Sequence, residues 1–144
     1  MSELGPVLTN DARPASSGRA TFYGTAYHKV SGRNQVALPR NMKREIDQAA
    51  EDQLLLMRWQ KEPFLRLYTK REFDRKLDDI KQHPQLTTDQ KADAIGGMAS
   101  SAEPIEPDSQ GRFVLPAKWV DMLNIKEEVA FCGFFTFIKI LPAD

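Results

Sequence analysis

Short β-prone runs separated by polar residues mark the first part of the chain. An aromatic segment spans residues 21–29, and the apolar run Gln35–Leu38 ends at Pro39, a residue that strands accept mainly at their ends. Between them lies the polar sequence Ser31–Asn34. This pattern predicts a strand, a turn and a second strand.

Apolar spacing then changes from that of a strand to that of a helix. Proline suits the first helical turn because its missing N–H would have no partner there. After Pro39, Met42, Ile46 and either Ala49 or Ala50 follow at i, i+4 and i+7 spacing. A short amphipathic helix is therefore predicted after Pro39.

A hairpin and a helical segment are predicted next. Two apolar runs, Leu54–Trp59 and Phe64–Tyr68, flank a turn-like stretch and predict the hairpin. A capping-box pattern begins at Thr69, and a second one at Thr87 opens a further helix. We expect this second helix to run through Ile95 and to be ended or weakened by Gly96 and Gly97, because glycine weakens a helix.

The last part of the chain has the same succession of patterns as the first. Residues 100–107 are expected to be extended, and Arg112–Leu115 predict a strand. An apolar-periodic helix follows Pro116. Residues 129–141 predict two buried strands separated near Gly133.

A shift of 77 residues superimposes two nine-residue segments, the second of which begins at Asp108. Leu38 and Pro39 then coincide with Leu115 and Pro116. Strand, polar turn, apolar residues, proline, short helix and strand pair follow in the same order in both halves. We interpret the halves as copies that complete one another's core, in preference to two independent domains.

Composition narrows the class of protein. The chain has 144 residues, of which 41% are hydrophobic and 28% charged, which is typical of one or two small globular domains. No stretch approaches the roughly 18 apolar residues of a membrane helix, and the start has no apolar segment typical of a secretion signal. We expect a cytoplasmic protein with no membrane partner.

Residues suited to catalysis or metal binding are few. Cys132 is the only cysteine, so it cannot form an internal disulfide or a cysteine-based zinc site, and there are two histidines, His28 and His83. No glycine-rich phosphate loop or nucleophile motif is present. Asp78 and Asp79 are adjacent on a predicted helix and do not face one another. We expect no enzyme, no cofactor, no metal and no small-molecule substrate.

Charge is distributed unevenly along the chain. Twenty basic and 20 acidic residues cancel, but the segment 19–44 has six basic residues and no acidic one. A local basic block is expected of a phosphate-binding surface, and the alternative is a solvated charged face.

The segment Asp108–Pro116 resembles the D-x-x-G-R-x-x-x-P signature of the SpoVT/AbrB-like swapped-hairpin domain. Two such copies, with Phe22-Tyr23-Gly24 before the first and a helical insert after Leu67-Tyr68, are similar to the MraZ family of bacterial transcriptional regulators. The resemblance covers roughly residues 21–141.

This resemblance implies an α+β, mainly β fold: a pseudo-twofold double swapped-hairpin β-barrel with short helices. Its expected parts are a disordered tail (1–20), the first copy (21–68), the helical insert (69–98) and the second copy (99–144). The resemblance further implies that the protein forms homo-oligomers, rings among them. It also implies a nucleoid-associated repressor at the promoter of the division and cell-wall gene cluster.

The first copy departs from the signature, because Ser31, Asn34 and Gln35 stand where the family has Asp, Gly and Arg. Gln35 can still bind a base or phosphate but carries no charge. The second copy has Val120-Asp121 in place of the basic pair of the first. We therefore assign DNA contacts to the first copy, through Lys29, Arg33, Gln35, Arg40, Lys43 and Arg44. Structural roles are assigned to Asp108, Gly111, Arg112, Pro39 and Pro116.

Three functions remain open at this point. The leading one is a sequence-specific regulator that binds double-stranded promoter DNA as a homo-oligomer. The second is an antitoxin-like module of the same fold whose partner is a protein. The third is a family remnant that oligomerises but has lost promoter recognition together with the Gly-Arg of its first copy.

Overall fold

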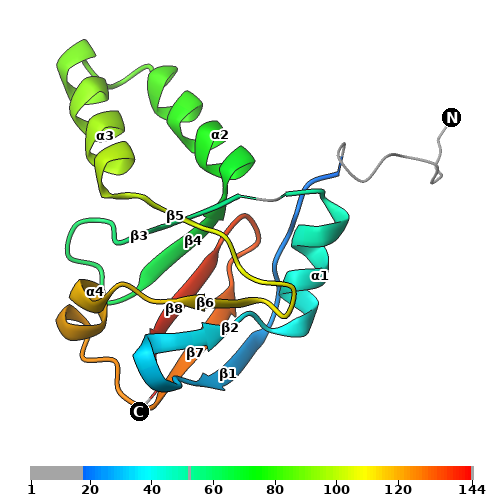
Figure 1. Ribbon diagram of the computed structural model, residues 1–144. Helices are drawn as coiled ribbons and strands as arrows, with labels where there is room; N and C mark the ends of the chain where they lie inside the picture. The colour runs from blue at the N-terminus through cyan, green and yellow to red at the C-terminus, as the bar shows by residue number, and fades with distance from the viewer. Residues whose placement is uncertain (1–17, 52, 144) are drawn as a thin grey trace, which may run out of the picture.

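The computed structural model describes residues 18–51 and 53–143, which form short strands and four α-helices (Figure 1). The elements of the first half are β1 (Thr25–Lys29), the 3₁₀ turn η2 (Gly32–Asn34), β2 (Gln35–Ala37), α1 (Arg40–Gln48), β3 (Leu54–Met57) and β4 (Leu65–Thr69). The helical insert consists of α2 (Lys70–Lys81) and α3 (Thr88–Ser101). The second half contains β5 (Glu103–Ile105), β6 (Arg112–Val114), α4 (Ala117–Met122), β7 (Glu128–Gly133) and β8 (Ile138–Pro142).

These elements form a mixed α+β fold with two antiparallel sheets. Six strands pair in the order β1-β7-β8-β4-β3-β5, and β2 and β6 form a separate two-stranded ribbon. The expected closed barrel is not present in the described part of the chain. Its two sheets stay separate because β2 and β6 pair with each other and leave β1 and β5 as edges of the larger sheet.

The main core lies between the ribbon and one face of the six-stranded sheet. Val36 and Phe113 point inward from the ribbon, while Met42 of α1 and Trp119 of α4 close the sides. The sheet contributes buried residues at alternating positions. They are Leu54, Leu56, Leu65, Leu67, Val129, Phe131, Ile138 and Ile140.

The strand order has a twofold pattern. It reads the same from either edge when each strand of the first half is exchanged for its counterpart in the second. The pattern centres on the ribbon, where Val36 pairs with Phe113, the residue 77 positions later. Matching hydrogen bonds flank this pair: the Leu38 N–H donates to Gly111 O and the Leu115 N–H to Asn34 O, both at 2.9 Å.

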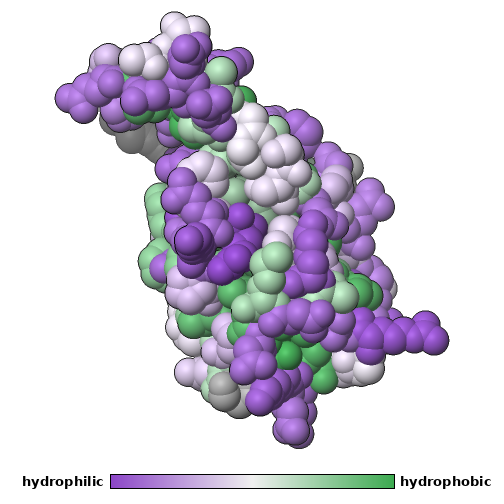
Figure 2. Space-filling view, turned by 90° about the vertical axis from the view of Figure 1, so that its left-hand side faces the viewer, coloured by the Kyte–Doolittle hydropathy of each residue, from purple (hydrophilic) through white to green (hydrophobic). Residues whose placement is uncertain are grey.

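The helices α2 and α3 pack on the opposite face of the sheet and project from it as a hairpin (Figure 1). Met57 and Tyr68 of the sheet form a second core there with Phe73 and Met98. In the view of Figure 2, the projecting end of this hairpin presents mainly hydrophilic side chains.

The helix α3 is longer than its sequence predicts. A capping box at Thr87 starts it as expected, but Gly96 and Gly97 lie inside it and it continues to Ser101. Buried Met98 holds the last turns against the sheet, which outweighs the weak helix propensity of glycine. The extended segment therefore starts at Ala102, and the expected boundary between residues 98 and 99 falls within the helix.

Most of the tail expected over residues 1–20 lies outside the described residues. Its last part, which begins at Gly18, is described, and Ala20 is buried in the main core. Within the described residues, no helix combines the length and the apolar character required to cross a membrane.

Candidate nucleic-acid interface

The outer face of the β2–β6 ribbon carries four side chains that alternate with the buried ones. Gln35 lies opposite Val114, and Ala37 lies opposite Arg112. Arg112 is exposed, and Val114, although apolar, is 51% exposed. A narrow antiparallel ribbon therefore presents polar and apolar groups side by side on one accessible surface.

A turn centred on Asp108 holds Arg112. Asp108 Oδ1 accepts hydrogen bonds from the backbone N–H of Gln110 at 2.9 Å and of Arg112 at 2.8 Å, and Oδ2 accepts one from Arg112 Nε at 2.7 Å. The backbone hydrogen bond of Arg112, followed by that of its side chain, lowers the pKa of Asp108 below its ordinary value. The carboxylate thus stays ionised and fixes the guanidinium on the ribbon.

Gly111 completes this turn in a conformation that favours glycine, with φ at +81°. A Cβ atom added there would lie 3.2 Å from Cδ of Lys43 and 3.4 Å from Cβ of Leu38. The absence of a side chain therefore lets α1 approach the turn of the second half closely.

The corresponding turn of the first half closes with the same backbone hydrogen bond, but Arg33 has a φ of +64° where Gln110 has no positive φ, and the side-chain chemistry differs. The Ser31 N–H donates to Gln35 O at 2.9 Å, as the Asp108 N–H donates to Arg112 O at 3.0 Å. Asn34 has a φ of +61° at the place of Gly111, a conformation that asparagine tolerates better than most residues. The Ser31 hydroxyl donates to Gln35 O at 3.2 Å, and no described residue forms a hydrogen bond with the Gln35 side chain.

The basic residues of α1 lie beside the Asp108 turn. Arg40 and Arg44 are exposed, and together with Lys43 they line a shallow hollow on the helix surface. Lys43 Nζ forms an ion pair of 2.7 Å with Asp47 Oδ2. Lys43 also lines a second hollow together with Asp108, so this part of the surface is built from both halves of the chain.

Lys29 and Arg33 are placed at the other end of the ribbon. Lys29 ends β1 and lies opposite Glu128 of β7, and exposed Arg33 belongs to η2 with a φ of +64°. Figure 1 shows η2 at the end of β2 that is remote from α1. The six residues predicted to bind DNA therefore form two groups, with Gln35 on the ribbon between them.

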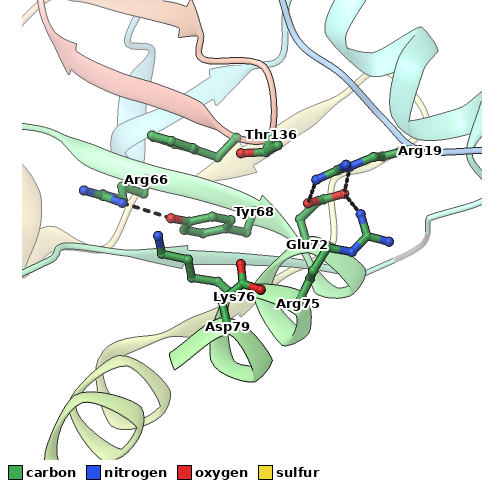
Figure 3. A pocket seen from close by; sticks show the side chains of 9 residues that line it. Arg19, Arg66, Tyr68, Glu72, Arg75, Lys76, Asp79 and Thr136 are labelled. Carbon is green, nitrogen blue, oxygen red and sulfur yellow. Dashed lines mark hydrogen bonds and ion pairs between the residues drawn. The ribbon is translucent and has the colours of Figure 1, made fainter. Parts of the chain in front are cut away.

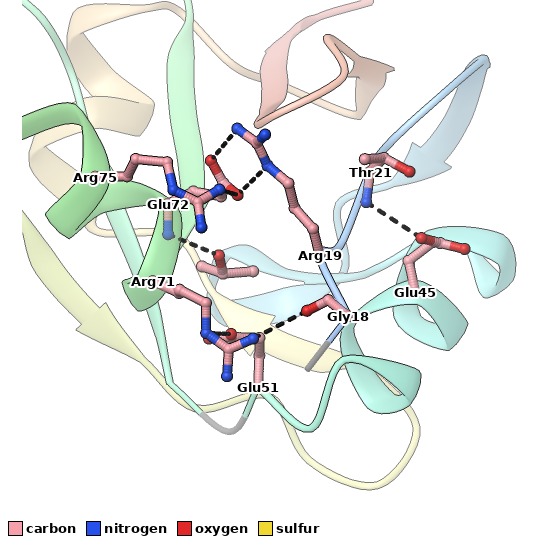
Figure 4. A network of polar contacts seen from close by, with 9 residues as sticks. Gly18, Arg19, Thr21, Glu45, Glu51, Arg71, Glu72 and Arg75 are labelled. Carbon is pink, nitrogen blue, oxygen red and sulfur yellow. Dashed lines mark hydrogen bonds and ion pairs between the residues drawn. The ribbon is translucent and has the colours of Figure 1, made fainter. Parts of the chain in front are cut away.

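Arg19 belongs to the basic segment by sequence but not to this surface. Its Nε and Nη2 bind Glu72 Oε2 at 2.6 Å and Oε1 at 2.9 Å, and Arg75 binds the same carboxylate at 2.8 Å (Figure 4). The Glu72 side chain is only 4% exposed. Its hydrogen bonds to Arg19 raise the pKa of that guanidinium, so Arg19 neutralises a buried carboxylate.

A neighbouring polar network connects the N-terminal segment that contains Arg19 to the helices α1 and α2. Arg71 donates to Gly18 O at 2.9 Å and forms an ion pair of 3.0 Å with Glu51, while the Thr21 N–H donates to Glu45 at 3.1 Å (Figure 4). These contacts link α1 and α2 through the segment that precedes β1.

A polar cavity lies next to this network. Arg66, Tyr68, Lys76 and Asp79 line it around the Arg19–Glu72 pair (Figure 3). Arg66 Nη1 donates to the Tyr68 hydroxyl at 3.0 Å, and its ion pair with Glu62 measures 2.6 Å. Because the arginines here already bind carboxylates, the cavity is a poor site for an anionic ligand.

Two residues that the sequence did not assign to DNA contacts lie on the outer face of the ribbon. The sequence favours a structural role for Arg112 over a functional pair with Asp108, and it does not single out Val114. The signal that could have found them is the alternation of a strand, because buried Phe113 requires both neighbours to face outward. No group of three His, Cys, Asp or Glu residues among those described could hold a metal ion.

Comparison with known proteins points to one family. The family model "MraZ protein, putative antitoxin-like" matches residues 98–144. A protein named transcriptional regulator MraZ from Bacteroides thetaiotaomicron is 21% identical over 119 residues, which cover 83% of this chain and 76% of that protein. Its namesake from Micrococcus luteus is 28% identical over 123 residues, covering 85% and 82% of the two chains. One from Bacteroides fragilis is 24% identical over 119 residues, covering 83% and 75%.

Proposed function

Because the chain belongs to the MraZ family of transcriptional regulators, we propose that it binds double-stranded promoter DNA in a sequence-specific manner. That family is not an enzyme family. The outer face of the β2–β6 ribbon and the exposed basic residues of α1 form the contact surface. Such a regulator acts in the cytoplasm, at the nucleoid.

The observation that carries this proposal is the ribbon with its flanking charges. The major groove of B-DNA admits a two-stranded antiparallel ribbon, whose outward side chains then meet the base edges. The helix α1, which carries Arg40 and Arg44, lies at one end of the ribbon, and η2, which carries Arg33, lies at the other. These three arginines form no ion pair with any described residue, so they can neutralise phosphates on both sides of the groove.

We further propose that residues 21–68 and 99–144 act as two related halves of one unit, with residues 69–98 as an insert. The pairing of Val36 with Phe113 supports this proposal. Repression of the division and cell-wall gene cluster is the role that the family resemblance suggests. The relatives' names support regulation of transcription in general.

Self-association is the second part of the proposal. Tyr23, Phe134 and Phe135 are exposed at one end of the six-stranded sheet, and the rings of Tyr23 and Phe135 lie 6.0 Å apart. Exposed aromatic groups of this kind favour protein contacts. An oligomer, closed as a ring or not, would bind repeated DNA sites with the combined strength of several weak contacts.

The decisive experiment is a fluorescence-anisotropy titration of the whole protein with DNA from upstream of its own gene. A scrambled duplex serves as the control, and both are measured at about 50 and 200 mM salt, where phosphate contacts differ strongly. We expect at least tenfold preference for the upstream DNA. Equal binding to both duplexes would instead favour the remnant that has lost promoter recognition.

Replacement of Lys43 and Arg44 by alanine tests the contact surface. The double variant should bind more weakly and lower the salt slope by up to about two units, one for each lost phosphate contact. Lys76 and Lys81, exposed on α2 away from the ribbon, provide the matched control when both are replaced by alanine. An unchanged slope in the first variant would refute the assignment to α1.

An antitoxin-like protein partner is the alternative that the description of the family model favours. In that case the protein would copurify with a second protein in a fixed ratio. Its affinity for the upstream and scrambled duplexes would then be equal.

A further inference from the structure

The two halves of the ribbon present different side chains at corresponding positions. Gln35 and Arg112 are the first residues of β2 and β6, and the backbone C=O of each accepts the hydrogen bond that closes the turn before it. They are diagonal neighbours on the outer face, since Gln35 pairs with Val114 and Arg112 with Ala37. Diagonal neighbours in an antiparallel pair are about 7–8 Å apart, which corresponds to roughly two base steps of about 3.4 Å.

Arg112 is positioned to make a bidentate contact with a base. Asp108 binds its Nε atom alone, and within the described residues the two terminal nitrogens have no partner. Because the guanidinium is planar, a carboxylate that fixes Nε also fixes the direction of these two donors. Paired donors of arginine match O6 and N7 of guanine in the major groove.

Gln35 and Val114 together match a different base pair. The side-chain amide of Gln35 has no hydrogen-bond partner among the residues described, and glutamine binds N6 and N7 of adenine with its two ends. Val114, directly opposite, is 51% exposed and belongs to neither hydrophobic core of the described residues. An apolar side chain there suits the methyl group of thymine.

We propose that this ribbon reads an asymmetric DNA element, in which Gln35 and Val114 recognise an A·T pair and Arg112 recognises a guanine about two steps away. The inference rests on the proposed function, because it names the bases read by the same surface. A ribbon with arginine at both positions would read equivalent bases at its two ends. Gln35 removes that equivalence, so the preferred element has no twofold symmetry at this point.

Selection from a randomised duplex library, with the whole protein, tests this inference. The wild-type protein should enrich an element with one guanine and one A·T pair at that spacing. Gln35→Ala should reduce the preference for adenine over other bases by roughly 5- to 100-fold, which is the discrimination that a bidentate base contact usually provides. Val114→Ser should weaken the preference for thymine at the same pair and leave the guanine unchanged.

Gln35→Arg is the sharpest variant, because it should convert the preference from adenine to guanine and make the element symmetric. Gln85→Arg adds the same charge at an exposed position between α2 and α3, and it should leave every base preference unchanged. Should Gln35→Arg raise affinity for all duplexes equally, Gln35 lies against the phosphate backbone and the inference is overturned. A wild-type protein that binds no duplex would overturn the proposed function itself.

Discussion

At the scale of single residues, the two turns before the ribbon strands share a closing hydrogen bond and differ in their side-chain chemistry. Asp108 holds Arg112 with a carboxylate, whereas Ser31 closes the matching turn with a hydroxyl, and no described residue forms a hydrogen bond with the Gln35 side chain. The D-x-x-G-R motif in the sequence predicted the first arrangement. It could not show that Asn34 adopts a positive φ at the place of Gly111, because a tolerated positive φ leaves no clear sequence pattern.

Replacement of Asp108 by Asn should reduce discrimination at the position read by Arg112 while the turn itself persists. The amide oxygen can still accept the backbone hydrogen bonds, but the charge that orients the guanidinium is lost. Competition between duplexes that differ at one base measures the change. Asp121→Asn, an exposed acid on α4, provides the control and should leave discrimination unchanged.

The difference in folding stability between wild type and Asp108→Asn should depend on pH with a defined sign. Because the folded protein lowers the pKa of Asp108, its ionised form stabilises the fold at neutral pH, and this contribution is lost as the pH falls below about 4. Urea denaturation should therefore show wild type more stable than Asp108→Asn at pH 7, with the difference shrinking in acid. A difference that grows in acid would contradict this assignment.

At the scale of elements, local patterns predicted most of what the structure contains. Pro39 and Pro116 each precede a helix as expected, and the apolar runs become the two hairpins. The pairing of β2 with β6 could not be predicted locally, since it joins strands 77 residues apart. The charge count placed Arg19 in the basic segment for the same reason: its ion-pair partner, Glu72, lies far along the chain and could not be seen locally.

In the helix α3, packing overrides the low helix propensity of two glycines. We therefore expect their replacement to change the stability of the protein. Gly96 and Gly97 are helical, and an added Cβ at either would meet no atom within 4 Å. Their replacement by alanine should stabilise the protein by about 0.5–1 kcal/mol each, because alanine loses less conformational freedom in a helix. Urea denaturation measures this, and Gly111→Ala, at a φ of +81°, is the contrasting variant that should destabilise.

At the scale of the whole molecule, the two faces of the six-stranded sheet are covered by different elements and to different extents. One face is buried under the ribbon, α1 and α4, and the other is covered by α2 and α3 over Met57 and Tyr68. Tyr27, on the same face at the β1 edge, is 64% exposed. Phe134 and Phe135 in the β7–β8 connection are 48% and 50% exposed. The single chain therefore leaves aromatic surface uncovered on the half of the sheet that lacks the insert.

A contact between copies would bury this aromatic surface, so its removal should weaken self-association. We expect the 16.3 kDa chain to sediment as an oligomer, and Phe134→Ser combined with Phe135→Asn to shift it towards the monomer. Asparagine is chosen at the second position because Phe135 has a φ of +63°, which asparagine tolerates. Met122→Ser, which removes an apolar side chain 60% exposed on α4, should leave the mass unchanged. If the double variant keeps the wild-type mass, the copies meet elsewhere. If it becomes monomeric, its affinity for single DNA sites should persist while that for repeated sites falls, because only the latter depends on linked copies.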